Sequence, residues 1–282
     1  MKEIILAPWG GLCNRMAAML SAIETQHVTG LKIQLMWDNV HLCKCDFDDL
    51  FYPLDMSSLN KDGAIYEEMS VQPIRKFYMH PDRRFYYMIP DMLRRFVYDK
   101  CYDGFELEEK DFKKMMDGYQ KVYIRACAPF SPYQLDAKVK VADIFKPKED
   151  IMERIHHVTE QFGNDVIGIH IRRTDHKGSI EGSPMEAFYS MMDAEMEQDN
   201  NVKFYVASDD EECKQQMRDR YGDRVVTAEW NLSRDCVEGM KDAVAELYCL
   251  GATRKIIGSA RSSYSNMAAR LNAIQVVKAV KK

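Results

Sequence analysis

Charged residues gather directly after an apolar run in the second half of the chain. Segment 170–175 reads His-Ile-Arg-Arg-Thr-Asp, and the residues just before it are apolar or glycine. Ligands of open parallel sheets bind beyond the carboxyl ends of the strands, where this segment would lie. An arginine there can bind a diphosphate bidentately, while a carboxylate such as Asp175 holds another guanidinium in place. The structural alternative is an ion-pair network between domains, because such networks also gather charge.

Two glycine- and serine-rich segments are candidate anion sites. Segment 9–15, Trp-Gly-Gly-Leu-Cys-Asn-Arg, reads as a turn into a helix, where backbone N–H groups favour an anion. Its two glycines equally suit a simple tight turn. Segment 258–266 carries several hydroxyl groups between a strand and a helix, a pattern typical of a phosphate-binding nest or of ordinary helix caps.

The fourth polar segment, 205–211, ends in Ser-Asp-Asp-Glu. Ser208 and Glu211 have the spacing of a helix capping box, and acidic residues suit a helix N-terminus. Asp209 and Asp210 are therefore either part of a helix start or members of a binding site at the end of a strand.

The elements that must position these segments alternate between strands and helices. The strands are predicted at 3–8, 31–37, 165–172, 202–208, 224–227 and 255–258, and the helices at 16–28, 151–162, 185–198, 211–221, 237–250 and 265–272. Such alternation predicts doubly wound α/β domains with parallel sheets. Residues 38–132 are less regular, and no element is assigned there. A boundary within 133–150 gives two domains, 1–140 and 141–282.

The composition is that of a folded globular protein. The 282 residues are 46% hydrophobic and 29% charged, with a net charge of −5, so the overall charge indicates no nucleic-acid partner. Every apolar run is broken by charge, and the apolar start is too short for a signal peptide, so we expect a cytoplasmic location. The eight cysteines are expected as reduced thiols. His41, Cys43 and Cys45 lack a second group of ligands, so no metal site is predicted.

Together, these segments resemble the fucosyltransferase superfamily that includes the core α1,6-fucosyltransferase of N-glycans, the nodulation fucosyltransferase and the protein O-fucosyltransferases. The first motif is closest to its α1,6 form. The resemblance covers residues 165–271 and does not extend to 38–132. The N-terminal loop and the three motifs match segments 10–15, 170–179, 205–210 and 243–269, the last with Glu246, Ser262 and Ser263.

The resemblance implies an α/β fold of the GT-B type, in which two Rossmann-like domains have parallel sheets that face a cleft. It implies an inverting, α1,6-fucosyltransferase-like glycosyltransferase that moves fucose from GDP-fucose to a glycan hydroxyl, without a metal or cofactor. The donor would bind mainly to domain 141–282, and domain 1–140 would serve the acceptor. Two alternatives stay open: another nucleotide sugar on the same scaffold, and a catalytically silent GDP-sugar-binding module.

The resemblance also implies roles for individual residues. Arg172 would neutralise the β-phosphate of the departing GDP, and Arg173 and Asp175 would shape the same site. His170 would contact the guanosine, and the carboxylate of Glu246 would accept from the guanine edge. The other donor-binding candidates are Gly10, Gly11, Asn14, Arg15, His176, Lys177, Asp209, Asp210, Ser262 and Ser263.

The chemistry fits these residue types. Displacement at the anomeric carbon builds negative charge on GDP, so a fixed Arg172 would stabilise the transition state more than the ground state. The acceptor hydroxyl needs a general base, for which Glu181 is the candidate, and one base without a second nucleophilic carboxylate implies a single inverting displacement. The chain departs from the family at three places. Glu181 matches the base of the α1,6 branch only after the alignment is shifted by one residue. His176 followed by Lys177 stands where the α1,6 branch has a lysine, and Glu246 stands where the family has aspartate.

Segment 75–98 mixes basic and aromatic residues densely. Such a surface could rest on an anionic bilayer or hold a lipid-linked glycan. The favoured alternative is an aromatic core fringed with solvated arginines, because no amphipathic helical pattern is convincing. The expected partners are thus a nucleotide-sugar donor and a glycan acceptor, with a lipid link and peripheral membrane contact as hypotheses. The sequence indicates no oligomeric state.

Overall fold

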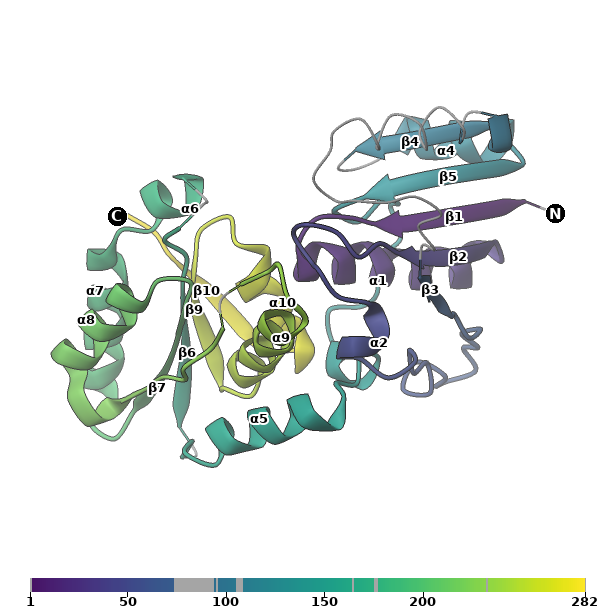
Figure 1. Ribbon diagram of the computed structural model, residues 1–282. Coiled ribbons are helices and arrows are strands. Elements are labelled where there is room, and N and C mark those ends of the chain that lie inside the picture. The colour runs from purple at the N-terminus through teal and green to yellow at the C-terminus, as the bar shows by residue number, and fades with distance from the viewer. Residues whose placement is uncertain are drawn as a thin grey trace. The chain divides into compact units, whose positions relative to one another are not determined.

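The protein consists of two compact units, each built on one sheet (Figure 1). The computed structural model describes residues 2–73, 94, 96–104, 109–163, 165–174, 177–231 and 233–281, apart from the side chains of residues 104, 109 and 111. The N-terminal unit comprises Met1–Asp136, Asp143–Lys146 and Arg234–Met240, and the C-terminal unit comprises Ala137–Ala142, Pro147–Ser233 and Lys241–Lys282. The predicted boundary at residue 140 falls between the two sheets. It does not account for Asp143–Lys146 and Arg234–Met240, which follow that boundary in the sequence but belong to the N-terminal unit.

The N-terminal unit holds a parallel five-stranded sheet in the order β3-β2-β1-β5-β4. Its central strand is buried along almost its whole length, as expected of a parallel strand covered on both faces. The first helix ends at Gly30, whose φ of 65° suits a glycine C-cap. The elements are β1 (Glu3–Pro8), α1 (Leu12–Thr29), β2 (Lys32–Trp37), α2 (Phe47–Leu50), β3 (Val71–Pro73), β4 (Lys100–Gly104), α4 (Glu109–Gly118) and β5 (Lys121–Ala126).

The C-terminal unit holds a second parallel sheet, in the order β10-β9-β6-β7-β8. Counted within the unit, this is the Rossmann order, in which the chain reverses its winding between the first and fourth strands. That switch point lies between β6 and β9. The elements are α5 (Glu149–Thr159), β6 (Val166–Ile171), α6 (Lys177–Gly182), α7 (Met185–Gln198), β7 (Lys203–Ser208), α8 (Glu211–Tyr221), β8 (Val225–Val226), α9 (Val237–Gly251), β9 (Lys255–Ser259), α10 (Ser263–Leu271) and β10 (Gln275–Ala279), with 3-10 turns at Val141–Asp143 and Gly222–Arg224.

Alternation along β6 decides which side chains face which helices. Ile167, Ile169 and Ile171 enter the core cluster that includes residues of α7 and α8. Gly168 and His170 therefore face the opposite side of the sheet, towards α9 and α10. A Cβ on Gly168 would lie 2.8 Å from Thr253 Oγ1, so glycine lets the end of α9 pack closely against the strand. Figure 1 shows α7 and α8 on one face of this sheet and α9 and α10 on the other.

The predicted α/β fold with two parallel sheets is confirmed, with shifts at the edges of elements. The first helix begins at Leu12 rather than 16, because Gly11 occupies its N-cap position in extended conformation. Residues 38–132, left unassigned from the sequence, hold the short strands β3, β4 and β5. The final strand β10, which pairs with β9 in parallel, was also not predicted.

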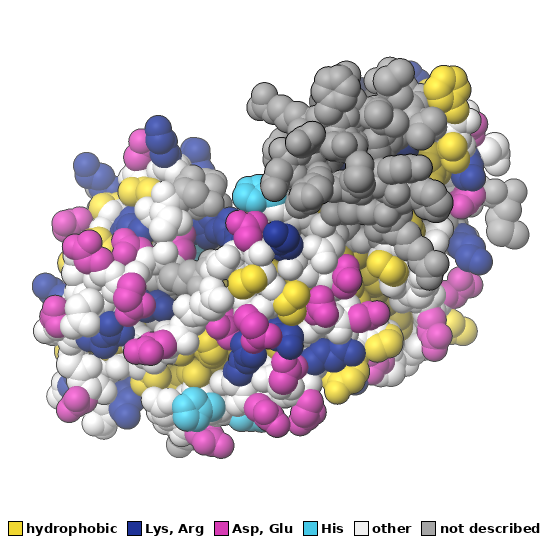
Figure 2. Space-filling model, in the orientation of Figure 1, with side chains coloured by type: hydrophobic (Ala, Val, Ile, Leu, Met, Phe, Trp, Pro, Cys, Tyr) yellow, Lys and Arg dark blue, Asp and Glu magenta, His cyan; other side chains and the backbone are white. Residues whose placement is uncertain are grey.

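The described surface mixes charges of both signs. On the face drawn in Figure 2, basic and acidic side chains are interspersed. This agrees with a net charge of only −5 over 282 residues. Among the helices that the structure describes, none has the length and apolarity needed to span a bilayer.

Candidate functional site

The candidate site lies at the topological switch point of the C-terminal sheet. Ser259, the last residue of β9, accepts a hydrogen bond from the backbone N–H of Arg172 at 3.0 Å and donates to the carbonyl of His170 at 3.3 Å. This hydroxyl therefore joins the carboxyl ends of β6 and β9, the place where open α/β sheets bind their ligands. Ser259 was not among the predicted site residues.

Asp209 organises the turn that follows β6. Its carboxylate accepts from the backbone N–H of Arg173 at 2.7 Å, and from the N–H and hydroxyl of Thr174 at 3.4 and 2.6 Å. It also pairs with Arg172 Nε at 3.2 Å, in a setting where both side chains are less than one-fifth exposed. Because these partners converge on one carboxylate, the Arg172 guanidinium is held at the end of β6. The ion pair lies within the C-terminal unit.

Arg173 points to the other face of the sheet. Its Nη2 donates to the Ser183 carbonyl at 2.8 Å, and its guanidinium lies 5.9 Å from the centre of the Phe188 ring on α7. Its Nε is buried without a hydrogen-bond partner. The direct donor contact assigned to Arg173 remains a prediction, whereas its contacts show how it fixes the start of α7.

His170, Tyr264 and Glu246 form a buried cluster on the α9–α10 face. The His170 and Tyr264 rings stack with centres 4.9 Å apart, and the Tyr264 hydroxyl lies 3.4 Å from Glu246 Oε2. Burial lowers the pKa of His170 to about 3 and raises the pKa of Glu246 to about 7. His170 Nδ1 and Glu246 Oε1 are buried without a partner.

The loop after β9 is clamped to α6. Ser179 Oγ donates to the Ala260 carbonyl and Ser183 Oγ accepts from the Ala260 N–H, both at 2.7 Å. Ser262 is the buried N-cap residue of α10, and Ser263 is its exposed first residue. Anion binding by the backbone N–H groups at this helix start remains a prediction.

The remaining candidates on α6, Lys177 and Glu181, are both exposed. They belong to the helix that Ser179 ties to the β9–α10 loop, so their backbone position is fixed relative to the switch point. Asp175 and His176 lie outside the described residues, as does most of segment 75–98.

Asp210 has a structural role at the start of α8. It is the N-cap residue, and its carboxylate accepts from the N–H of Glu212 at 3.0 Å. The predicted capping box between Ser208 and Glu211 is wrong, because Ser208 Oγ accepts from the N–H of Asp210 and Glu211 pairs with Arg218 at 2.8 Å. The N-cap of α8 is thus two residues later than the capping box requires.

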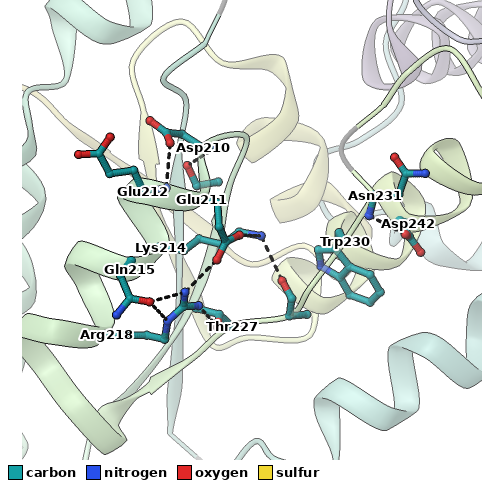
Figure 3. A network of polar contacts seen from close by, with 12 residues as sticks. Asp210, Glu211, Glu212, Lys214, Gln215, Arg218, Thr227, Trp230, Asn231 and Asp242 are labelled. Atoms are coloured by element: carbon teal, nitrogen blue, oxygen red, sulfur yellow. Dashed lines mark hydrogen bonds and ion pairs between the residues drawn. The ribbon is translucent and has the colours of Figure 1, made fainter.

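A polar network holds the segment 227–231 against α8 (Figure 3). The buried Lys214 donates to the Ala228 carbonyl at 3.1 Å, and Arg218 donates to the Thr227 hydroxyl at 2.8 Å. Trp230 Nε1 donates to the Tyr205 hydroxyl at 3.3 Å. Figure 3 shows Lys214 reaching from α8 towards this segment. Lys214 was missed because a lysine in a polar helix is normally solvated.

The loop that contains Gly10 and Gly11 in the N-terminal unit is held by the buried side chain of Arg15. Gly10 has a φ of 83°, which favours glycine, and its carbonyl accepts from Arg15 Nε at 2.8 Å. Arg15 is fully buried, donates from Nη1 to the Asp38 carbonyl at 2.6 Å and lies over the Trp37 ring. The guanidinium of Arg15 is thus directed into the core. A Cβ added at Gly11 would have no atom within 4 Å. Asn14 is half-buried and lies in the first turn of α1.

Among the described residues, no group of three histidine, cysteine, aspartate or glutamate side chains is arranged to hold a metal ion.

Comparison with known proteins supplies the fold relationship. No protein-family model and no curated protein matches the sequence. A point mutant of Arabidopsis thaliana FUT1 in complex with GDP matches with a TM-score of 0.62 at 14% identity, over 98% of this chain and 70% of that one. The fold of the chain is similar to that of solved fucosyltransferases. POFUT1 in complex with GDP matches at 0.59 and 10% identity, over 98% of both chains, and fucosyltransferase NodZ from Bradyrhizobium at 0.57 and 15% identity, over 95% and 92%.

This similarity of fold agrees with the resemblance seen in the motifs. The motifs consist of residue types, whereas the structural match reflects the path of the backbone. The structural likeness covers 98% of the chain, so it is not confined to residues 165–271.

Proposed function

We propose that the chain is a glycosyltransferase that moves fucose from GDP-fucose to a glycan hydroxyl by a metal-independent, inverting displacement. One observation carries the proposal: Arg172 is held by Asp209 at the switch point of a sheet whose fold is shared with fucosyltransferases. Structures of such proteins contain GDP or GDP-fucose, as for POFUT1 in complex with GDP and NodZ soaked with GDP-fucose.

Arg172 would act on the leaving group. As the glycosidic bond to phosphate breaks, negative charge grows on the diphosphate, and a guanidinium already oriented by Asp209 needs no reorganisation to stabilise it. The start of α10, with Ser262 and Ser263, would donate to the other phosphate oxygens. Charge neutralisation by fixed donors is the reason that no metal is required in this proposal.

Glu246 and His170 would bind the base of the donor. Each has a buried polar atom without a partner, on the α9–α10 face of the switch point. A guanine edge offers N–H groups to a carboxylate, which matches the role that the family resemblance gives Glu246.

Glu181 is the proposed general base. It is exposed on α6, and α6 is tied to the β9–α10 loop through Ser179 and Ser183. An exposed carboxylate can accept the proton of an incoming hydroxyl once the acceptor is bound. The glycan acceptor is proposed from the α1,6-like form of segment 170–179.

Calorimetric titration in excess chelator tests the donor. We expect tight binding of GDP and GDP-fucose, weaker binding of GDP-mannose and no binding of UDP. Binding that appears only after Mg²⁺ or Mn²⁺ is added would contradict metal independence. Preference for a uridine nucleotide would indicate a different nucleotide sugar, and binding of GDP-fucose without turnover across a glycan acceptor screen would indicate a silent module.

A further inference from the structure

The cluster of His170, Tyr264 and Glu246 is incomplete without a ligand. Glu246 and His170 are only 8% and 4% exposed, yet Glu246 Oε1 and His170 Nδ1 have no hydrogen-bond partner. A buried polar atom without a partner is costly, and proteins keep few of them. Two such atoms on neighbouring elements around one tyrosine indicate a place where a ligand supplies the missing bonds.

The hydrogen bonds around Tyr264 leave Glu246 with little support for a negative charge in the unliganded protein. The Tyr264 hydroxyl lies 2.7 Å from the Ala243 carbonyl oxygen and 3.4 Å from Glu246 Oε2. A phenol has one proton, and the shorter contact to Ala243 takes it because a carbonyl can only accept. Towards Glu246 the hydroxyl is therefore only a distant donor at 3.4 Å, and Glu246 Oε1 has no partner, so a negative charge on this buried carboxyl group would have little hydrogen-bond support.

The surroundings of Glu246 favour the same state. Burial is the largest influence on its pKa, which rises to about 7, and Asp209 and Asp242 act in the same direction. Lys214 and the hydrogen bond from Tyr264 lower this pKa, but the charge of Lys214 is shared with Glu211 at 3.5 Å and the Tyr264 contact is long, so burial prevails and the neutral carboxyl group is favoured. The titratable and charged groups around the cluster are His170 on β6, Tyr205 on β7, Asp209 after β7, Lys214 on α8, Asp242 and Cys249 on α9, Tyr264 on α10 and, next to His170, Arg172 after β6 and Lys278 on β10.

We propose that binding of the nucleotide base is coupled to release of one proton from Glu246. The unliganded carboxyl group is neutral; the base brings N–H donors to the oxygens, the O–H bond of the carboxyl group breaks, and the proton passes to solvent. The carboxylate left behind accepts from the base. This inference rests on the proposed function and adds to it a proton that is exchanged at each binding event.

The sign of the pH effect follows from the proton balance. A carboxyl group that must ionise for binding weakens affinity below its pKa and leaves it unchanged above. With a pKa of about 7, the ionised fraction at pH ~6 is about one tenth, so we expect about tenfold weaker binding at pH ~6 than at pH ~8. His170 stays neutral in this range because burial lowers its pKa to about 3. Lys278, whose pKa burial lowers to about 8, loses positive charge as the pH rises and would change anion binding in the opposite sense.

Calorimetry of the full chain with GDP-fucose measures the proton directly. GDP-fucose is the suitable probe because its diphosphate is esterified at both ends and has no proton that titrates near neutral pH. At pH ~6, nearly one proton should be released for each GDP-fucose bound. The binding enthalpies observed in two buffers should then differ by nearly the full difference between the ionisation enthalpies of those buffers, and this difference should shrink towards pH ~8. Equal enthalpies in both buffers, with affinity independent of pH, would refute the inference and leave the donor assignment intact.

Two variants and a spectroscopic readout complete the test. Glu246→Gln removes the titrating group, so proton release should vanish, whereas Glu246→Asp should keep it. Infrared spectra of the unliganded protein at pH ~6, with carboxyl-labelled glutamate, should show a protonated-acid band that Glu246→Gln lacks. A missing band in the wild-type protein would overturn the inference even if a variant failed to fold. A band without any binding of a guanine nucleotide would support the neutral carboxyl group and contradict the proposed function instead.

Discussion

Asp209 determines what the residues after β6 can do. Its carboxylate accepts from Arg172, Arg173 and Thr174, three consecutive residues that would otherwise form a loose turn. Charge-assisted bonds of this kind are shorter and stronger than bonds between neutral groups. The Arg172 guanidinium therefore has a defined position before any ligand arrives, which is the condition for electrostatic catalysis.

We expect replacement of Arg172 by alanine to abolish most transfer activity. The turnover rate should fall by about 100- to 1000-fold, because the developing charge on the leaving group loses its fixed partner. Arg172→Lys should recover only part of the rate, since lysine keeps the charge but lacks the guanidinium geometry. Initial-rate assays with GDP-fucose and a responsive acceptor measure the effect.

Arg254→Ala is the matched control for this prediction. Arg254 lies at the amino ends of β6 and β9, where its N–H donates to the Val166 carbonyl and its side chain pairs with Asp165 and Glu195. Losing such partly exposed ion pairs changes stability by about 1 kcal/mol or less and should leave turnover unchanged. Transfer by the Arg172 variant at the rate of the Arg254 variant would contradict the phosphate role.

The sequence predicted the site residues that directly follow apolar runs. Arg172 and Asp209 each come just after a buried strand, so their place at the sheet edge follows from the pattern. Lys214 and Ser183 could not be found in this way, because each acts through a backbone carbonyl or N–H group far away in the sequence. Which backbone group each side chain meets depends on the conformation of a distant loop, and the residues next to Lys214 or Ser183 in the sequence do not indicate that conformation.

At the scale of elements, the packing of α10 on β9 depends on a glycine. A Cβ on Gly258 would lie 2.5 Å from Ser265 Oγ and 2.6 Å from Ser265 Cβ, in the first turn of α10. Lys278, the register partner of Gly258 on β10, donates to the same Ser265 hydroxyl at 2.9 Å. The helix start that carries Ser262 and Ser263 is therefore fixed by close contact with the sheet.

We expect Gly258→Ala to displace this helix start. Overpacking of this kind costs about 1–3 kcal/mol of unfolding free energy, and donor affinity should fall as well because the N–H groups proposed to bind phosphate would move. Chemical denaturation and calorimetry measure the two effects. Gly163→Ala, at a position with no atom within 4 Å of an added Cβ, should change neither. Unchanged donor affinity in a destabilised Gly258→Ala protein would show that the start of α10 does not contact the donor.

Long apolar runs made most strands predictable, whereas some short or half-buried strands were not predictable. Strands β6 and β7 are six-residue runs that are almost wholly buried, so the pattern identifies them. Strand β3 has three residues, and β10 is only half-buried as an edge strand, so neither carries a strong periodic signal. Burial in these strands comes from neighbours that the local sequence does not reveal.

At the scale of the whole molecule, the chain passes between its two units more than once. Residues 143–146 return to the N-terminal unit, where Phe145 is fully buried and contacts Phe47 and Phe51 with ring centres 6.5 and 5.5 Å apart. Residues 234–240 also return, with Arg234 accepting from the N–H of Lys44. The stability of the N-terminal sheet therefore depends on residues that follow it in the sequence.

We expect Phe145→Ala to weaken the N-terminal unit selectively. Removing this buried ring costs about 3–5 kcal/mol, and hydrogen exchange should accelerate in β1, β2 and β5 before it does in β6, β7 and β9. Phe188→Ala, in the core of the C-terminal unit, should give the reverse order. Equal acceleration of both sheets in both variants would indicate that the units unfold as one.

The return of residues 234–240 bears on the order of events during synthesis. Strand β5 ends at Ala126, but the last segment of the N-terminal unit leaves the ribosome about 100 residues later, after β6, β7 and β8. At ordinary translation rates this delay is roughly 5–20 s. The unit that is made first is thus completed only after three strands of the second sheet have been made, so it must remain soluble without its last segment during that time.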